Sequence, residues 1–334
     1  MRLLFVAADF GGSSWYRIVQ PAGLCQELYE ESKWSLPDQL PVKYLQESDI
    51  VILQRQCHDI AYKSTQRLLK LNKIIVSEID DNIWSIPPDT ENMYKFWTKD
   101  RIKGFGEILK ISHAVTVSTP KLAKMVSEFN KNVYVVPNLV VFDRSYVKPD
   151  YGKVRIGWAG SESHMPDFTD DIQDALLDIK ETFKDRVDIF MFGIVSPKLF
   201  TKVTFYPFLQ PHLFLANLQK IGMDIGVVPN RQNLFNDCRS NLKFVEYSSV
   251  RAVTIASKTD SYNNSIINGQ NGILIRKNSR KAWYNAIKEM IENETARRQI
   301  ADRAYDYCYE NFSVQRKMKQ YCVYMEILNK VQGG

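Results

Sequence analysis

Three side chains near residue 240 have the types and spacing to bind a diphosphate. Arg239, Lys243 and Glu246 are separated by four and three residues, so on a helix they project from one side of its first two turns. Ser240 is a suitable N-cap for a helix over 241–250. Cations beside a helix N-terminus favour a diphosphate, because free N–H groups and the helix dipole add to their charge. Glu246 could accept both hydroxyls of a ribose; the alternative is a solvated face with a Lys243–Glu246 surface pair.

The segments 239–257 (RSNLKFVEYSSVRAVTIAS) and 262–275 (YNNSIINGQNGILI) resemble the C-terminal donor-binding segment of family-4 glycosyltransferases, which have the GT-B fold. In that family a Glu-bearing helix precedes a strand and an Asn-Gly turn. Glu246 matches the second Glu of the family's paired-Glu motif. The first Glu would fall eight residues earlier, where Cys238 stands with Asp237 beside it.

The resemblance also includes AVTVSTPKLA at 114–123 and VYVVPN at 133–138, and it implies an α/β architecture. We expect two Rossmann-like, doubly wound domains that face a central cleft. These are an acceptor domain over 1–145 and a donor domain over 150–315, with a C-terminal helix over about 316–334 that crosses back to the first domain. Apolar runs predict strands at 3–8, 49–54, 73–79, 114–118, 133–137, 154–158, 188–192, 203–208, 224–228 and 252–257.

The first predicted strand runs into Gly11 and Gly12, and a helix over 18–29 follows. Ligands of doubly wound domains bind at the carboxyl ends of the strands. The run GGSS does not match GxGxxG, and no GxxxxGK[ST] occurs, so a dinucleotide or P-loop enzyme is disfavoured. Gly11 and Gly12 are candidates for close approach to the donor; the alternative is a tight turn that needs small residues.

Polar side chains also follow the next strands of the first domain. Four residues are candidate acceptor contacts: Trp15, Tyr16, Arg17 and Arg55. Asp80 and Asp81 end the strand at 73–79, where side chains project over the crevice, and are candidate catalytic residues. Alternatively, one of them caps the next segment. A metal site of the DxD type is disfavoured for Asp80 and Asp81, because the two acids are adjacent rather than alternate. GT-B enzymes also generally need no metal.

In the second domain the strand at 154–158 leads to a turn at Gly160 and Ser161. Family-4 members usually follow this turn with an Arg and a Lys that grip the diphosphate. That pair is missing here, so we assign its role to Arg239 and Lys243. His164 in this turn is more commonly a cap than a catalyst. The candidate donor contacts are Gly11, Gly12, Gly160, Ser161, Pro229, Asn230, Ser240, Lys243 and Glu246, with Pro229 and Asn230 as a base-recognition edge.

Composition limits the class of protein. The 334 residues are 45% hydrophobic and 25% charged, which suits a globular chain of two domains. The five cysteines form no CxxC pair, so free thiols in a reducing cytosol are the simplest interpretation. No run approaches the roughly 18 apolar residues of a membrane span. We expect a cytoplasmic protein that needs no metal and no cofactor besides its nucleotide-sugar co-substrate.

These observations predict a retaining glycosyltransferase that moves a hexose from a nucleotide diphosphate sugar, with UDP-sugars favoured, to an acceptor hydroxyl. Residues 1–145 hold 18 basic and 17 acidic residues, and 146–334 hold 26 and 21, so the acceptor domain is nearly neutral. A surface glycan or lipid-linked sugar is therefore the favoured acceptor. The alternatives are a phage-type enzyme acting on hydroxymethyl pyrimidine in DNA through Lys95, Lys99, Arg101 and Lys103, a catalytically impaired nucleotide-sugar binding protein, and an epimerase.

Overall fold

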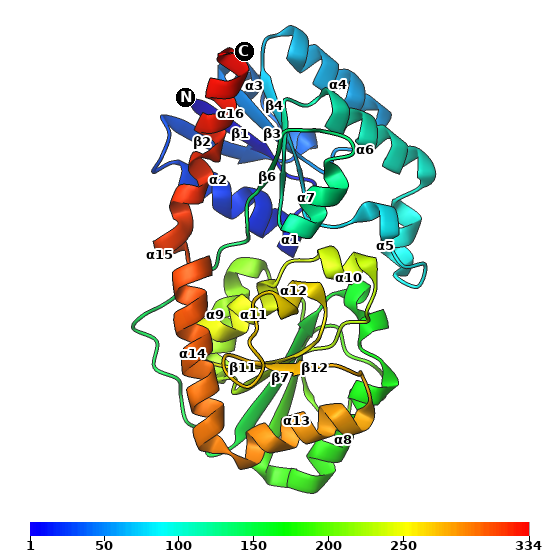
Figure 1. The fold of residues 1–334 in the computed structure, drawn as a ribbon, viewed down its shortest axis with the longest axis vertical. Coiled ribbons are helices and arrows are strands. Elements are labelled where there is room, and N and C mark those ends of the chain that lie inside the picture. Colours follow the sequence, from blue (N-terminus) through cyan, green and yellow to red (C-terminus); the bar gives the residue numbers. More distant parts are fainter. Residues whose placement is uncertain (334) are drawn as a thin grey trace.

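Two sheets of six strands each form the centres of two domains in the computed structural model, which describes residues 1–333 (Figure 1). The first sheet has the order β2-β1-β3-β4-β5-β6, with β1 at Arg2–Val6, β2 at Glu31–Ser35, β3 at Ile50–Gln54, β4 at Ile74–Ile79, β5 at Ala114–Val117 and β6 at Val133–Val135. The second has the order β12-β11-β10-β7-β8-β9, with β7 at Val154–Gly160, β8 at Val187–Gly193, β9 at Thr204–Pro207, β10 at Ile225–Val228, β11 at Val253–Ser257 and β12 at Ile273–Ile275. The pairings in both sheets are parallel.

Helices cover both faces of each sheet. Those of the first domain are α1 (Gly12–Ser14), α2 (Gln20–Cys25), α3 (Val42–Glu47), α4 (Asp59–Lys70), α5 (Glu91–Phe96), α6 (Lys99–Ile111) and α7 (Pro120–Val126). Those of the second are α8 (Asp170–Phe183), α9 (Pro211–Ile221), α10 (Leu234–Cys238), α11 (Leu242–Ser249), α12 (Asp260–Asn263), α13 (Arg280–Glu292) and α14 (Glu294–Phe312). The chain ends with α15 (Val314–Lys317) and α16 (Val323–Gln332).

The apolar runs form buried strands because successive side chains enter cores on opposite faces of the sheet. In β1, Leu3 and Phe5 belong to one apolar cluster, and Leu4 and Val6 belong to another. Both clusters consist of fully or largely buried side chains. Central strands such as β1, β3 and β11 are therefore buried on both faces, without the alternation of a one-sided sheet.

Strand order differs between the domains and marks where a ligand should bind. In the first sheet the order reverses between β1 and β3, and in the second it reverses between β7 and β10. A crevice forms at the carboxyl ends of the strands on either side of such a switch point. The residues at these ends are Ala7–Gly12 and Arg55 in the first domain, and Gly160, Ser161, Pro229 and Asn230 in the second.

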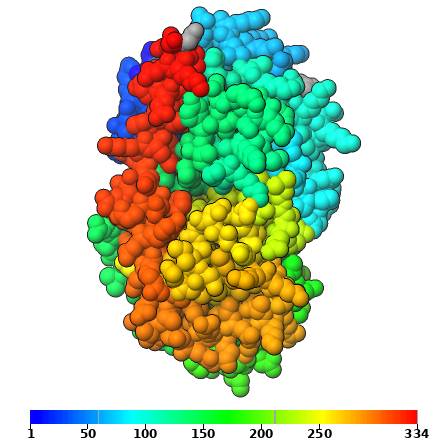
Figure 2. All heavy atoms as spheres, in the orientation of Figure 1, coloured from blue at the N-terminus to red at the C-terminus, as the bar shows by residue number. Residues whose placement is uncertain are grey.

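The predicted return of the C-terminal helix to the first domain is confirmed. Figure 1 shows α14 running along the second domain and α16 lying on the first, and Figure 2 shows these residues covering one side of both. The Tyr29 hydroxyl donates to the Tyr321 carbonyl at 2.6 Å, and the Tyr324 ring lies 5.5 Å from that of Phe5. The last helices are therefore part of the first domain's core.

The helix predicted over 18–29 begins earlier and is irregular. It starts at Gly12, passes through a π-helical turn at Trp15–Val19 and ends at Cys25. Such turns are frequent at functional sites, because the extra residue changes where the following side chains point. Tyr16 and Arg17 lie in this turn.

Candidate active site

The carboxyl edges of the two sheets meet in a layer of contacts, here called the seam. Tyr16 donates to Glu246 at 2.8 Å, Asp81 lies 3.7 Å from Arg239, and Asn82 lies 3.5 Å from the Cys238 sulfur. Each pair joins one domain to the other. The residues predicted for the donor and acceptor sides are therefore brought together.

Arg239 lies between carboxylates of both domains. It is the C-cap residue of α10, and its guanidinium stacks 4.6 Å from the Phe235 ring centroid. Its Nε is 3.7 Å from Asp81 Oδ1, and its Nη1 is 3.7 Å from Asp167 Oδ2. These separations exceed a tight ion pair, so its donors can still serve a phosphate.

Lys243, Glu246 and Tyr16 form a chain of polar groups in which Tyr16 and Glu246 are buried and Lys243 is partly exposed. Lys243 Nζ lies 2.7 Å from Glu246 Oε2, while the Tyr16 hydroxyl donates to Glu246 Oε1. Burial and the Glu246 carboxylate raise the pKa of Tyr16 well above its usual value. The expected Lys243–Glu246 pair exists, but Glu246 is 1% exposed, so it is not a surface pair. Both carboxylate oxygens therefore have donors within the protein, and ribose binding by Glu246 stays a prediction.

Ser240 does not cap the helix as predicted. The N-cap is Asn241, whose side chain makes no capping bond, and α11 begins at Leu242. The Ser240 hydroxyl instead accepts a hydrogen bond from Asn138 Nδ2 of the first domain at 3.0 Å. Ser240 thus contributes to the seam, while the first N–H groups of α11 have no side-chain cap.

The turn after β7 places a histidine beside the cations. Gly160 pairs with Gly193, whose φ is +89°, and a Cβ on Gly193 would lie 2.3 Å from the Gly160 oxygen, so only glycine fits. The Ser161 backbone N–H donates to His164 Nδ1 at 3.3 Å. Burial lowers the pKa of His164 well below its usual value, and Arg239 and Lys243 lower it further. The neutral ring therefore carries its proton on Nε2, which makes Nε2 a donor.

Pro229 and Asn230 follow β10 and are buried. The Asn230 N–H donates to Ser257 Oγ at 2.8 Å, and its carbonyl accepts from Asn278 at 2.7 Å. The loop is thus held firmly at the switch point. Contact with a base stays a prediction.

Asp80 and Asp81 lie at the carboxyl end of β4, as expected. The Ser13 hydroxyl donates to Asp80 Oδ2, and Oδ1 is buried without a hydrogen-bond partner among residues 1–333. Burial and the adjacent charge of Asp80 raise the pKa of Asp81, which Arg239 opposes. Neither carboxylate caps a helix; the 3₁₀ turn that follows is capped by Asn82. Their catalytic role stays a prediction.

Arg55 sits in a strained backbone conformation at the end of β3. Its φ is +48°, unusual for a residue with a side chain, and strain of this kind concentrates at functional sites. Its Nη2 lies 2.9 Å from Asp9 Oδ2, and Asp9 also accepts from the Gly11 N–H at 2.7 Å. A Cβ on Gly12 would meet nothing within 4 Å. The loop thus leaves open space at Gly12, where a ligand could approach.

The predicted acceptor residues of the first helix separate into two groups. Trp15 lies across the seam from His212, with ring centroids 5.6 Å apart. Arg17 is instead buried inside the first domain, where its Nε lies 2.6 Å from Glu78 Oε1 and its Nη1 donates to Asn138 at 2.9 Å. The Arg17 guanidinium is thus engaged inside the first domain in this structure, and its direct contact with an acceptor stays a prediction. Tyr16 is likewise engaged, by Glu246.

Asp167 is a seam residue that the sequence analysis missed. Its side chain is 4% exposed, and Oδ1 accepts from the Arg231 N–H and Nε and from Asn236 Nδ2 at 2.9–3.1 Å. Arg231 also pairs with Asp89 of the first domain. The only sequence signal was an acid six residues after the Gly160–Ser161 turn.

The position that matches the first Glu of family-4 glycosyltransferases holds Cys238, which has no carboxylate. The Asp237 carboxylate lies 3.1 Å from Lys121 Nζ and accepts a hydrogen bond from the Asp260 backbone N–H. Cys238 is buried, and burial raises the pKa of its thiol. Within residues 1–333 no group of three His, Cys, Asp or Glu side chains is arranged to hold a metal ion. Over the same residues no helix is long and apolar enough to cross a bilayer.

Comparison with known proteins gives structural likeness only. No protein-family model and no curated protein matches the sequence. Anabaena HepE (Alr3699), solved in complex with UDP-glucose, is similar with a TM-score of 0.68 at 13% identity over 98% of this chain and 99% of that chain. The chain has the GT-B fold.

Two further structures agree over nearly the whole chain. A glycosyltransferase from Rickettsia africae has a TM-score of 0.66 at 15% identity, covering 98% of each chain. A candidate UDP-N-acetylglucosamine 2-epimerase from Listeria monocytogenes has a TM-score of 0.61 at 9% identity, over 100% of this chain and 97% of that chain. At these identities the fold alone is shared, and one fold serves more than one chemistry. Membership of family 4 stays a prediction.

Proposed function

We propose that this protein is a retaining, metal-independent glycosyltransferase that moves a hexose from a UDP-sugar to an acceptor hydroxyl. The main observation in support of this proposal is that two cations and two acids face each other across the seam. Arg239 and Lys243 lie at the carboxyl edge of the second sheet, opposite Asp80 and Asp81 of the first. The UDP-glucose and UDP-sugar names of similar structures support the choice of donor. The unpaired cysteines support a cytoplasmic location.

In the proposed reaction, the bond between the anomeric carbon and the diphosphate oxygen breaks and the acceptor oxygen bonds to that carbon. The acceptor proton passes to the leaving diphosphate. Arg239 and Lys243 stabilise the negative charge that grows on the diphosphate, usually the largest catalytic contribution. His164 adds a neutral Nε2–H donor, and Asp81 stabilises positive charge on the sugar.

Glu246 binds the ribose hydroxyls in this proposal. Its carboxylate is already buried and oriented by Lys243, so it needs little reorganisation. The Tyr16 hydroxyl must leave Oε1 when the ribose enters, which couples donor entry to a movement at the seam. Gly11, Gly12, Gly160, Ser161, Ser240, Pro229 and Asn230 are the remaining proposed donor contacts, and Trp15 and Arg55 the proposed acceptor contacts.

The proposed acceptor is a glycan or a lipid-linked sugar. For the DNA alternative, Lys95 is paired with Glu91, and the Arg101 guanidinium stacks 4.3 Å from the Phe96 ring and donates to its carbonyl. Of the four cations proposed for a duplex, Lys95 therefore has a carboxylate partner, and Arg101 is oriented by Phe96 but keeps its charge. A mobility-shift assay with hydroxymethylated and plain duplexes tests this. Tight, steeply salt-dependent binding that Lys99→Glu with Lys103→Glu weakens would favour DNA.

The primary experiment is a thermal-shift screen of the purified chain with UDP-, GDP-, ADP- and TDP-sugars, since a ligand of the folded state raises the unfolding temperature. We expect the largest shift with a UDP-sugar, and transfer or slow hydrolysis that releases UDP. The substitution of Cys238 for a carboxylate favours one rival, a binding protein without catalysis. Binding without any UDP release would establish that rival, and an isomerised nucleotide sugar would establish an epimerase.

A further inference from the structure

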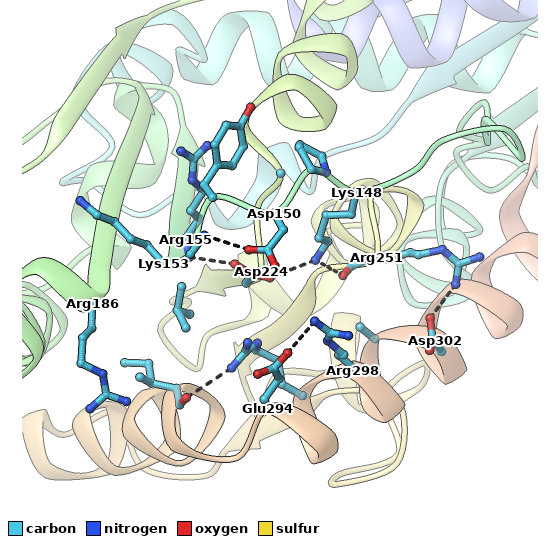
Figure 3. A pocket seen from close by; sticks show the side chains of 18 residues that line it. Lys148, Asp150, Lys153, Arg155, Arg186, Asp224, Arg251, Glu294, Arg298 and Asp302 are labelled. Atoms are coloured by element: carbon cyan, nitrogen blue, oxygen red, sulfur yellow. Dashed lines mark hydrogen bonds and ion pairs between the residues drawn. The ribbon is translucent and has the colours of Figure 1, made fainter.

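A cavity lies at the opposite edge of the second domain from the seam. It has a volume of about 510 Å³, in the range of small-molecule sites. Its walls come from residues 148–153, which lead into β7, from the residues just before β10 and β11, and from the α13–α14 junction (Figure 3). It therefore surrounds the amino ends of the strands and shares no residue with the donor site.

The lining is basic, with seven Lys and Arg side chains against four carboxylates. Three of the carboxylates have cationic partners: Asp224 with Lys148 at 3.3 Å, Asp302 with Arg251 at 2.6 Å, and Glu294 with Arg298 at 2.5 Å. The fourth, Asp150, accepts from the Gly152 N–H at 2.8 Å. Outside the lining, Asp188 lies 3.5 Å from Lys153. The acids near the cavity are thus already engaged.

Three guanidinium groups of the lining have no carboxylate partner among residues 1–333. Arg155 stacks 3.3 Å from the Tyr151 ring centroid and donates to the Ile221 carbonyl. Arg297 donates to the Met290 carbonyl at 2.7 Å at the end of α13, and Arg186 lies 5.3 Å from the Phe183 ring centroid. Aromatic rings and carbonyls orient these planar groups but do not neutralise their charge.

We propose that this cavity binds a small phosphorylated ligand through the guanidinium groups of Arg155, Arg186 and Arg297. Guanidinium forks match the paired oxygens of a phosphate, and several around one concave site suit a phosphate ester or a diphosphate. Burial lowers the pKa of Lys148 at the same site, and an anion would favour its charged form. Carboxylates such as Asp302 and Glu294 lie between the cations of the lining, so the cavity offers no continuous basic track, and the ligand is compact and not a nucleic acid.

The test is calorimetric titration of the full chain at moderate salt with two probes, inorganic diphosphate and a hexose phosphate. The variants are Arg155→Lys, which keeps the charge and removes the fork, and Arg186→Gln. Arg298→Gln is the matched control, because Arg298 lines the same cavity but is paired with Glu294. Lys243→Met separates this site from the donor site, and thermal unfolding confirms that each variant is folded.

We expect saturable binding of at least one probe that survives Lys243→Met and Arg298→Gln. Each of Arg155→Lys and Arg186→Gln should weaken it by about tenfold or more. A stronger response to hexose phosphate identifies an ester as the ligand, and a stronger response to diphosphate identifies a free anion. Absence of binding, binding that ignores Arg155→Lys and Arg186→Gln, or binding lost with Lys243→Met overturns the proposal. Because the two sites share no residue, these outcomes do not depend on the proposed transferase activity.

Discussion

The two sheet edges that meet at the seam have one architecture and opposite charge. The edge of the first domain carries four acids, Asp9, Glu78, Asp80 and Asp81, with Arg17 and Arg55 among them. The edge of the second carries Arg231, Arg239 and Lys243, with Asp167 and Glu246 as their partners. An acidic edge facing a basic edge suits a reaction in which positive charge develops on a sugar and negative charge on its leaving group.

The two edges also differ in how closely their charged side chains are paired. On the basic edge Arg239 lies 3.7 Å from each of its carboxylates, which leaves its donors available. On the acidic edge Glu78 is fully buried against Arg17, and burial raises the pKa of Glu78 to about 7. Arg239 is therefore the most loosely paired cation of the basic edge, where Lys243 and Arg231 have close carboxylate partners, and Glu78 on the acidic edge supports its own domain.

The strongest test of the basic edge is Lys243→Met. If the ammonium meets charge that grows as the diphosphate leaves, kcat should fall by about 10²- to 10³-fold, with a smaller change in donor affinity. Steady-state kinetics with the preferred donor measure both quantities. Lys281→Met, an exposed lysine on α13, is the control and should leave both unchanged. Equal losses in the two parameters would assign Lys243 to ground-state binding alone.

The matching test of the acidic edge is Asp81→Asn. Removal of its charge should lower kcat/KM by about 10- to 100-fold. Burial raises the pKa of Asp81, so the active carboxylate is protonated, and activity lost, as pH falls through a value above the ordinary Asp range. A pH profile should show this acidic limb in the wild type and lose it in the variant. An unchanged limb would assign the titration to another group.

Ten of the twelve strands could be predicted because most of them are apolar runs, and β12 at Ile273–Ile275 was not assigned. Only β2 was missed from the first sheet, since ESKWS is polar and has the mixed burial of an edge strand. The register of the π-helical turn at Trp15–Val19 could not be predicted, because nothing in WYRIV distinguishes it from an α-helix. Because of that turn, the Arg17 side chain points into the first domain and the Tyr16 side chain reaches Glu246.

The candidate site could be predicted where one local segment supplies it, and not where two distant segments meet. Lys243 and Glu246 lie on adjacent turns of α11, so their spacing places them together, whereas Arg239 precedes that helix as the C-cap of α10. Asp167 reaches Arg239 only through the packing of the second domain. Ser240 is a residue type suited to an N-cap. Its hydroxyl instead accepts a hydrogen bond from Asn138, which is 102 residues away in the sequence. Contacts of this kind are set by tertiary structure, which local spacing does not contain.

A smaller effect is expected where the two edges share one carboxylate. Glu246→Gln should weaken UDP-sugar binding by about tenfold, because an amide is a poorer acceptor for two ribose hydroxyls. Tyr16→Phe removes the competing donor and should leave UDP-sugar affinity equal or higher. Calorimetric titration of both folded variants decides this. If the two substitutions weaken binding equally, the Tyr16–Glu246 contact holds the domains together and Glu246 does not bind the ribose.

The smallest effect expected is that of a chelator. Arg239 and Lys243 supply the positive charge that a metal would otherwise bring to the diphosphate. On the acidic edge, Asp80 Oδ2 accepts from Ser13 and Asp81 faces Arg239 at 3.7 Å, and no third carboxylate, His or Cys of residues 1–333 joins them in an arrangement for an ion. UDP release measured with and without excess EDTA should therefore agree within error. Loss of activity with EDTA, restored by Mg²⁺ or Mn²⁺, would show that the acidic edge binds a metal with the donor and that the opposite charges of the two edges do not alone drive the reaction.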